Sequence, residues 1–249
     1  MKTEKEINIT AAILSGGLGT RLRPVVKDRP KVLSEVMGRC FLTYILDQLA
    51  LTGIQDVVLC SGYQSEMIPR ALGYSYKTMN LIYSKEKKPL GTCGAVCNAL
   101  PHIRNNRILV MNGDSYINFN IARYLEWFFR INRQASIALT HVPDVGRYGK
   151  VVIADNQAVS EFTEKGADHG PGWINAGVYI LNKNLLESLP SGTPSSLEHD
   201  FFPDLIGKGL YGFPTTGEFI DIGTPDAYQQ AENFFREIFS SDDMRSDQI

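Results

Sequence analysis

The sequence predicts an α/β fold in which helices cover both faces of a mostly parallel sheet. Short, continuously apolar runs alternate with helical stretches through the first half of the chain. Strands buried on both faces of a parallel sheet have this continuous apolar character. The second half is more mixed, but it holds no internal repeat, low-complexity linker or sharp change of composition. We therefore expect one domain over residues 1–240, followed by a polar tail over 241–249.

The first half is predicted to supply four strands and four helices. The run AAILS at residues 11–15 predicts a buried strand, and residues 41–51, which Gly53 follows, predict an amphipathic helix. The remaining strands are expected at 57–61, 81–84 and 108–112, and the remaining helices at 65–72, 94–100 and 122–133.

The second half is predicted to add strands and two further helices. The strands are expected at 136–141, 149–153, 159–162 and 174–181, and the helices near 197–206 and 226–239. Asp155 and Asn156 mark a turn between two of these strands. The last ten residues, SSDDMRSDQI, are polar, and chain ends of this kind are poorly ordered.

Composition and charge exclude several classes of protein. The chain has 249 residues, 43% of them hydrophobic and 21% charged, which is typical of a globular protein with a core. Its 25 Lys and Arg against 27 Asp and Glu give a net charge of −2, so no basic surplus indicates nucleic-acid binding. No apolar run approaches a membrane span or a signal peptide, and we expect a cytoplasmic location.

The cysteines do not indicate a metal site. Cys40, Cys60, Cys93 and Cys97 form no CxxC pair, and the histidines show no HExxH spacing. Cys93 and Cys97 can share a helix face, but two soft ligands alone make a poor site. We expect buried, reduced thiols.

A glycine-rich loop follows the first predicted strand. Gly16, Gly17 and Gly19 precede the cations Arg21 and Lys31. Glycines allow the backbone to approach a ligand closely, and successive amide groups can then surround phosphate oxygens. Arg21 and Lys31 can neutralise phosphate charge.

Two common phosphate-binding loops do not fit this segment. A Walker A loop requires Gly-Lys-Ser/Thr, which is absent, and Leu22 stands where a dinucleotide fingerprint requires its third glycine. The segment from Leu14 to Lys31, LSGGLGTRLRPVVKDRPK, instead resembles the signature of the sugar-1-phosphate nucleotidyltransferases. The resemblance implies a Rossmann-like three-layer sandwich with a mostly parallel mixed central sheet. It also implies that Leu14, Gly16, Gly17, Gly19 and Thr20 bind a nucleoside triphosphate and that Arg21 and Lys31 assist the departure of pyrophosphate.

Further segments match the same family in the expected order. The stretch PLGTCGA at 89–95 resembles the base-contacting loop, with Cys93 where Ala or Gly is more usual, and Gly62 and Tyr63 can line the base pocket. The base contacts implied are Pro89, Gly91, Thr92 and Gly94.

Two carboxylates are candidates for a metal site. Asp114 follows the strand at 108–112, where parallel sheets place ligands, and Asp221 lies in DIGTP at 221–225, which matches the family in full. Oxygen donors of this kind suit Mg²⁺, which binds through one or two carboxylates plus substrate phosphates. Thr224 and Pro225 also fit a helix start. The resemblance implies that Asp114 is catalytic and that Asp114 and Asp221 hold Mg²⁺.

Glu164, Lys165 and NAGVY at 175–179 resemble the sugar-phosphate pocket of the family. Glu164 is expected to accept hydrogen bonds from sugar hydroxyls, and Lys165 to pair with the phosphate. Asn175 can donate and accept hydrogen bonds, and Gly177 leaves space for the ring. Gly149 completes the predicted pocket. The family often has Glu-Lys-Pro, whereas Gly166 follows here.

The implied reaction joins a nucleoside triphosphate and a sugar 1-phosphate. It needs no protein nucleophile, so catalysis is by positioning and charge stabilisation. Stretches at 142–149, 164–167, 196–203 and 210–214 resemble the guanylyltransferase branch that uses GTP and a manno-configured heptose 1-phosphate for bacterial surface glycans, close to mannose-1-phosphate guanylyltransferases.

The sequence alone leaves other functions open. A uridylyl- or thymidylyltransferase acting on glucose 1-phosphate shares every phosphate and metal motif. A non-catalytic sensor on the same fold predicts loss of Arg21, Lys31, Asp114 or Asp221, and all four are present. We expect no nucleic-acid or membrane partner, and the sequence leaves a homo-oligomer open.

Overall fold

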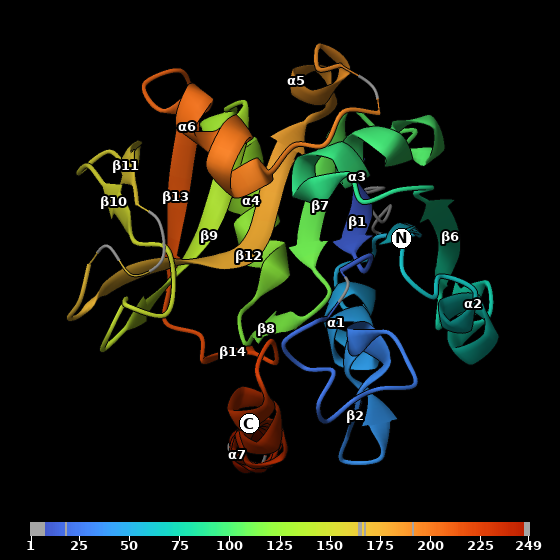
Figure 1. The fold of residues 1–249 in the computed structure, drawn as a ribbon. Helices are drawn as coiled ribbons and strands as arrows, with labels where there is room; N and C mark the ends of the chain where they lie inside the picture. The colour runs from blue at the N-terminus through green and yellow to red at the C-terminus, as the bar shows by residue number, and fades with distance from the viewer. Residues whose placement is uncertain (1–7, 18, 164–165, 167, 191, 247–249) are drawn as a thin grey trace, which may run out of the picture.

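The computed structural model describes residues 8–17, 19–163, 166, 168–190 and 192–246, with side chains to residue 240. An eight-stranded sheet forms the centre of the molecule (Figure 1). Its order is β13 (Leu210–Thr215), β9 (Ala135–Val142), β12 (Gly172–Asn182), β7 (Arg107–Asn112), β1 (Thr10–Leu14), β4 (Asp56–Ser61), β6 (Met79–Lys85) and β5 (Ser75–Tyr76). β12 runs antiparallel to β7 and β9, and β5 runs antiparallel to β6, whereas the other pairs are parallel. The predicted mostly parallel mixed sheet is confirmed.

Helices cover both faces of this sheet, because each central strand is apolar on both sides. In β1, Ala11 and Ile13 face one hydrophobic cluster and Ala12 faces the other. The first cluster includes α1 (Phe41–Ala50), α2 (Met67–Leu72), α4 (Ile121–Ile131) and α7 (Pro225–Ser246). The second includes α3 (Gly91–Ala99), α5 (Lys183–Glu187), a π-helix (Leu197–Phe201) and α6 (Phe202–Leu205). These three layers confirm the predicted sandwich.

Three small two-stranded sheets extend the fold. β10 (Val151–Ile153) pairs with β11 (Val159–Phe162), and β2 (Glu35–Val36) pairs with β3 (Arg39–Cys40). β14 (Phe219–Asp221) pairs antiparallel with β8 (Ser115–Ile117), which sets Asp221 opposite Ser115. This last pairing brings Asp221, the last residue of β14, back to the carboxyl end of β7.

The structure corrects several predicted boundaries. The helix expected near 197–206 is a π-helix over Leu197–Phe201 followed by a short α-helix over Phe202–Leu205. The helix expected at 226–239 is longer than predicted, since α7 ends at Ser246. β13, β14 and β8 were not predicted. β13 contains Gly212 and Pro214, and proline is tolerated there because β13 lies at the edge of the sheet.

The expected reduced thiols are present, with two buried (Cys60, Cys93) and two partly buried (Cys40, Cys97), and none is in a disulfide. Among the described residues, no helix is both long and apolar enough to cross a bilayer.

Candidate active site

The candidate site lies where β1 and β7 end side by side. Gly113 follows β7, and its amide donates to the Leu14 carbonyl at 2.9 Å. A Cβ on Gly113 would lie 2.7 Å from that carbonyl oxygen, so only glycine allows the two strand ends to come this close. The carboxyl ends of parallel strands are where such sheets bind ligands. The glycine loop and Asp114 therefore leave the sheet next to each other.

Lys31 joins the two predicted metal carboxylates. It begins a 3-10 turn, η1 (Lys31–Leu33), which the buried Val32 and Leu33 anchor. Its Nζ donates to Asp114 Oδ2 at 2.8 Å and to Asp221 Oδ1 at 3.4 Å. The Lys31 side chain is 11% exposed, against 42% for Asp114 and 28% for Asp221. One largely buried cation thus holds two carboxylates that remain accessible.

Backbone contacts fix the two carboxylates. The Ile222 amide donates to the Asp114 carbonyl at 3.0 Å, and the Gly223 amide donates to Asp221 Oδ1 at 2.7 Å. Asp221 arrives at the end of β14, which pairs with β8. The arrangement depends on chain segments more than 100 residues apart.

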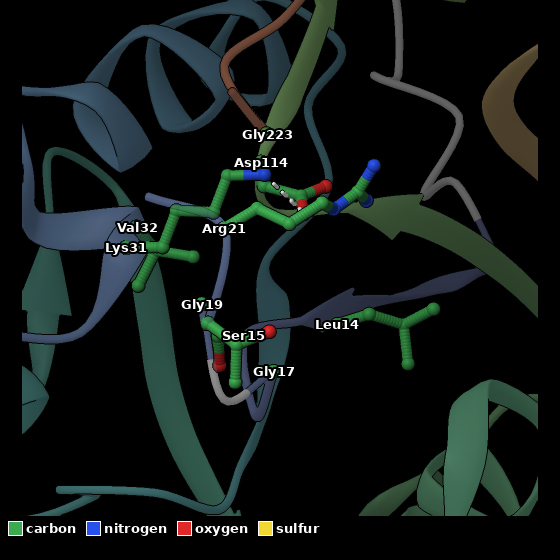
Figure 2. A pocket seen from close by; sticks show the side chains of 10 residues that line it. Leu14, Ser15, Gly17, Gly19, Arg21, Lys31, Val32, Asp114 and Gly223 are labelled. Carbon is green, nitrogen blue, oxygen red and sulfur yellow. Dashed lines mark hydrogen bonds and ion pairs between the residues drawn. The ribbon is translucent and has the colours of Figure 1, made fainter. Parts of the chain in front are cut away.

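A first cavity of about 220 Å³ lies against the glycine loop. Lys31 points at Asp114 on one side of it, and the loop that carries Gly17 and Gly19 lies below (Figure 2). Its lining includes seven of the residues predicted to bind the nucleotide or act on it: Leu14, Gly17, Gly19, Thr20, Arg21, Lys31 and Asp114.

A second cavity of about 350 Å³ adjoins the first, since Asp114 lines both. Of the residues predicted for the sugar phosphate and the metal, it contains Gly149, Asn175, Gly177, Asp114 and Asp221. Glu164 and Lys165 lie outside the described residues. Two cavities that share one carboxylate can hold two substrates whose reacting atoms meet at Asp114.

Gly177 is required by close packing in the second cavity. It adopts a φ of +73°, and its amide donates to Asn175 Oδ1 at 2.8 Å. A Cβ there would lie 2.7 Å from Asn112 Nδ2 and 2.8 Å from Ser115 Oγ. The predicted reason for this glycine was space for a sugar ring. The structure shows a different reason, which is that the absence of a Cβ allows the Asn112 and Ser115 side chains to pack against Gly177.

The other residues predicted for the nucleotide lie outside the first cavity. Pro89 is exposed. The guanidinium carbon of Arg23 lies over the Tyr63 ring, 4.9 Å from the ring centre. Gly91, Thr92 and Gly94 contact residues 193–198. Their predicted contact with a base remains a prediction.

Glu86 occupies the gap between Gly16 and Gly62. Its Oε1 lies 2.7 Å from the position of a Cβ on Gly16, and closer still to one on Gly62. Its Oε2 accepts from the Leu90 amide at 3.2 Å. Burial raises the pKa of this carboxyl. Sequence reasoning missed Glu86 because the run KEKK around it has the composition of a solvated surface.

Glu198 and His199 line the second cavity and were also missed as individual residues. They lie on the π-helix, a rare element that often occurs at functional sites. Ser196 caps this helix by accepting from the amides of Glu198 and His199, both at 3.2 Å. A Ser three residues before His199 is a signal for a helix start, but not for a ligand.

Asp114 and Asp221 are suitable ligands for a divalent cation. Both supply hard oxygen donors, both are accessible, and an ammonium group already lies between them. Among the described residues, no three His, Cys, Asp or Glu side chains cluster in a way that would enclose a metal. A two-carboxylate site of this kind fits a cation whose remaining ligands come from substrate phosphates and water.

The chain is similar to known proteins over almost its whole length. The sequence profile of the family described as "Nucleotidyl transferase" matches residues 10–238. The D-glycero-alpha-D-manno-heptose 1-phosphate guanylyltransferase of Aneurinibacillus thermoaerophilus is 37% identical over 89% of this chain and 96% of that protein. The mannose-1-phosphate guanylyltransferase of Mycobacterium tuberculosis is 33% identical over 88% of this chain, which spans 62% of that protein.

A solved structure shares the fold. The crystal structure of HddC from Yersinia pseudotuberculosis complexed with GMP-PN superposes with a TM-score of 0.80 and 34% identity, covering 91% of this chain and 99% of that one.

Proposed function

The chain belongs to the nucleotidyl transferase family, and we propose that it joins GTP and D-glycero-α-D-manno-heptose 1-phosphate into GDP-heptose with release of pyrophosphate. The observation that carries this proposal is the position of Asp114 between the two cavities, held by Lys31 together with Asp221. The glycine-loop cavity suits the triphosphate, and the second cavity suits the sugar phosphate. The two would then meet at the charged residues that the reaction needs.

The reaction transfers a nucleotidyl group without a protein nucleophile. An oxygen of the sugar phosphate attacks the α-phosphorus, a new P–O bond forms, and the bond from the α-phosphorus to the bridging oxygen breaks. Pyrophosphate leaves with that oxygen and its electron pair. Catalysis of this kind depends on positioning and on stabilising negative charge. Arg21 and Lys31 line the nucleotide cavity and supply positive charge there.

Nucleotidyltransferases of this family generally use a divalent metal. We propose Mg²⁺, held by Asp114 and Asp221, because both side chains are oxygen donors of the type that Mg²⁺ prefers. When bound, the ion supplies positive charge that offsets the repulsion between two phosphate-bearing substrates. The backbone amide of Gly223 and the ammonium of Lys31 orient the carboxylates for this role.

We propose that Glu86 selects guanine over uracil and thymine. Guanine presents two adjacent donors, N1–H and the 2-amino group, and a carboxylate can accept from both. Uracil and thymine place one N–H between two carbonyl oxygens, which a carboxylate repels. Glu86 lies between Gly16 and Gly62, among the segments predicted to hold the nucleotide. The GMP-PN complex of the similar HddC supports the same choice.

The second cavity supports a sugar substrate. Asn175, Glu198 and His199 give its wall hydrogen-bonding groups, and Tyr148, Phe162 and Phe219 give it aromatic surface. The choice of heptose rests on the similar heptose 1-phosphate guanylyltransferase of Aneurinibacillus thermoaerophilus, 96% of which this chain covers. The similar mannose-1-phosphate guanylyltransferase makes mannose 1-phosphate the alternative sugar substrate. The site draws on residues from Leu14 to Gly223, which supports a single domain over residues 1–240.

The test is a grid of substrates. Purified protein is incubated with Mg²⁺, one of GTP, ATP, UTP, CTP or dTTP, and one of heptose, mannose or glucose 1-phosphate, and pyrophosphate release is measured. We expect the highest kcat/KM for GTP with the manno-heptose phosphate. A preference for UTP or dTTP with glucose 1-phosphate would overturn the assignment of both pockets. A preference for mannose 1-phosphate with GTP would overturn the assignment of the sugar substrate and leave that of the nucleotide in place.

A further inference from the structure

Two segments far apart in the sequence lock together beside the second cavity. The Ser195 amide donates to the Leu90 carbonyl at 2.8 Å. The Ser195 carbonyl in turn accepts from the amides of Cys93 at 3.0 Å and Gly94 at 3.2 Å. Gly91, with a φ of +71°, leaves no room for a Cβ against the Ser195 carbonyl oxygen. The start of α3 and the residues before the π-helix therefore form one unit.

Thr92 connects this unit to the cavity wall. Its hydroxyl accepts from the Leu197 amide at 2.7 Å and donates to Glu198 Oε2 at 2.8 Å. A threonine hydroxyl has one hydrogen to donate. That hydrogen is committed to Glu198, so it is not available for a nucleotide.

The Glu198 carboxylate is held by three donors. Besides Thr92, its Oε2 accepts from Ser196 Oγ at 2.9 Å, and its Oε1 accepts from the Tyr179 hydroxyl at 3.1 Å. Tyr179 is fully buried, and burial, reinforced by the charge of Glu198, raises its pKa well above the usual range. Tyr179 therefore stays protonated and remains a donor to Glu198.

These contacts leave acceptor capacity at the cavity. A carboxylate has about four lone-pair positions. Within the described part of the chain, three are used, and the fourth is on Oε1 of a side chain that lines the second cavity. Sugar hydroxyls are the donors that such a position accepts.

We propose that Thr92 is a positioning residue for sugar-phosphate binding, because its hydroxyl holds Glu198 against the second cavity as an acceptor for a sugar hydroxyl. The proposal rests on the proposed function and adds a residue to it. Thr92 lies in the segment that we expected to contact the base, and this role assigns it to the other substrate. A purely structural role for Thr92, as a partner of the π-helix, would affect stability and leave both KM values unchanged.

The test compares three threonine variants. Thr92→Val removes the hydroxyl and keeps the shape of the side chain. Thr92→Ser keeps the hydroxyl and removes the methyl group. Thr52→Val is the matched control, because Thr52 also donates one hydrogen bond, to the Leu49 carbonyl at 2.6 Å, and accepts one, from the Ile54 amide at 3.2 Å. It lines neither cavity. Pyrophosphate release is measured with each substrate varied at saturating levels of the other.

We expect Thr92→Val to raise KM for the sugar phosphate about tenfold, the effect of losing one hydrogen bond to a charged group, with KM for GTP changed less than about twofold. Thr92→Ser should restore the wild-type value, and Thr52→Val should leave both KM values unchanged. If stably folded Thr92→Val keeps its KM for the sugar phosphate, or raises KM for GTP instead, the proposal is wrong.

A second variant covers the case in which Thr92→Val does not fold. Glu198→Gln keeps the side-chain shape and replaces one acceptor oxygen with a donor, and it should also raise KM for the sugar phosphate selectively. An unchanged KM in this variant would equally overturn the proposal. Wild-type protein without pyrophosphate release in any substrate combination would instead overturn the proposed function, and the role of Thr92 with it.

Discussion

Lys31 donates a hydrogen bond to Asp114 across 83 residues of sequence, with 2.8 Å between Nζ and Oδ2. The same Nζ lies 3.4 Å from Asp221, a further 107 residues along the chain. Lys31 is more buried than either carboxylate. Its position is therefore fixed by the fold, and the two carboxylates are drawn together beside it in advance of any substrate.

Asp221→Asn should reduce kcat strongly while the protein stays folded. The substitution keeps the size of the side chain but removes a charge that Lys31 and the proposed Mg²⁺ share. Loss of one group that stabilises charge in a reaction typically costs about a hundredfold to a thousandfold in rate. Pyrophosphate release across a Mg²⁺ titration checks this.

Asp56→Asn is the matched control for Asp221→Asn. Asp56 is a surface carboxylate that accepts a hydrogen bond from Asn80, and it lines neither cavity. It should keep the wild-type rate. If the Asp221→Asn protein has the wild-type kcat at every Mg²⁺ concentration, Asp221 does not hold the metal.

Glu86→Gln should weaken GTP binding and leave the sugar phosphate unaffected. The amide offers one acceptor and one donor where guanine requires two acceptors. We expect KM for GTP to rise about tenfold to a hundredfold, because hydrogen bonds to charged groups contribute about 1.5–3 kcal/mol. Steady-state kinetics with each substrate varied measure the two effects. Glu66→Gln, at an exposed carboxylate paired with Lys85, is the control and should change neither KM.

Acid should weaken GTP binding through Glu86. Burial raises the pKa of Glu86 above its ordinary value, so this carboxyl becomes protonated at a higher pH than an exposed glutamate. Guanine needs the ionised form. KM for GTP should therefore rise as pH falls through the raised pKa and reach a constant value above it. Glu86→Gln should lose this pH dependence, and if it retains the wild-type profile, another group is responsible.

Gly177→Ala should destabilise the protein more than an ordinary left-handed glycine does. Its φ is +73°, and an added Cβ would lie 2.7 Å from Asn112 Nδ2. Gly207 has a φ of +74°, and a Cβ added there would meet no atom within 4 Å, so Gly207→Ala isolates the backbone cost, about 1–2 kcal/mol. Gly177→Ala should lower the free energy of unfolding by more than this, in urea denaturation. Equal losses in the two variants would show that the contact with Asn112 adds nothing.

Much of the fold could be predicted from local patterns. β1, β4 and β7 are continuously apolar because both their faces are buried, and the sequence shows this directly. β8 and β14 could not be predicted, since each has only three residues and exists by pairing with the other. The antiparallel direction of β12 is likewise a property of its neighbours rather than of its own residues.

The parts of the candidate site that could be predicted are those whose residues lie in a short, contiguous sequence motif. The glycine loop with Arg21 and Lys31, and the aspartates 114 and 221, were found in this way, and the structure brings them together. Glu86 and Glu198 could not be found, because a single glutamate carries no signal of burial. The hydrogen bond between Thr92 and Glu198 could not be predicted either, because 106 residues separate the two in the sequence.

The pairing of β8 with β14 has a consequence for how the protein acquires activity. Asp221 reaches Asp114 only when β14, near the end of the chain, pairs with β8, which precedes it by about 100 residues. A nascent chain on the ribosome can form β1, β4 and β7 well before β14 emerges. Contacts between residues so far apart in sequence form late, because closing the long loop costs entropy. The paired aspartates therefore require β14 to have been synthesised, and a chain that lacks β14 has a glycine loop without the second carboxylate.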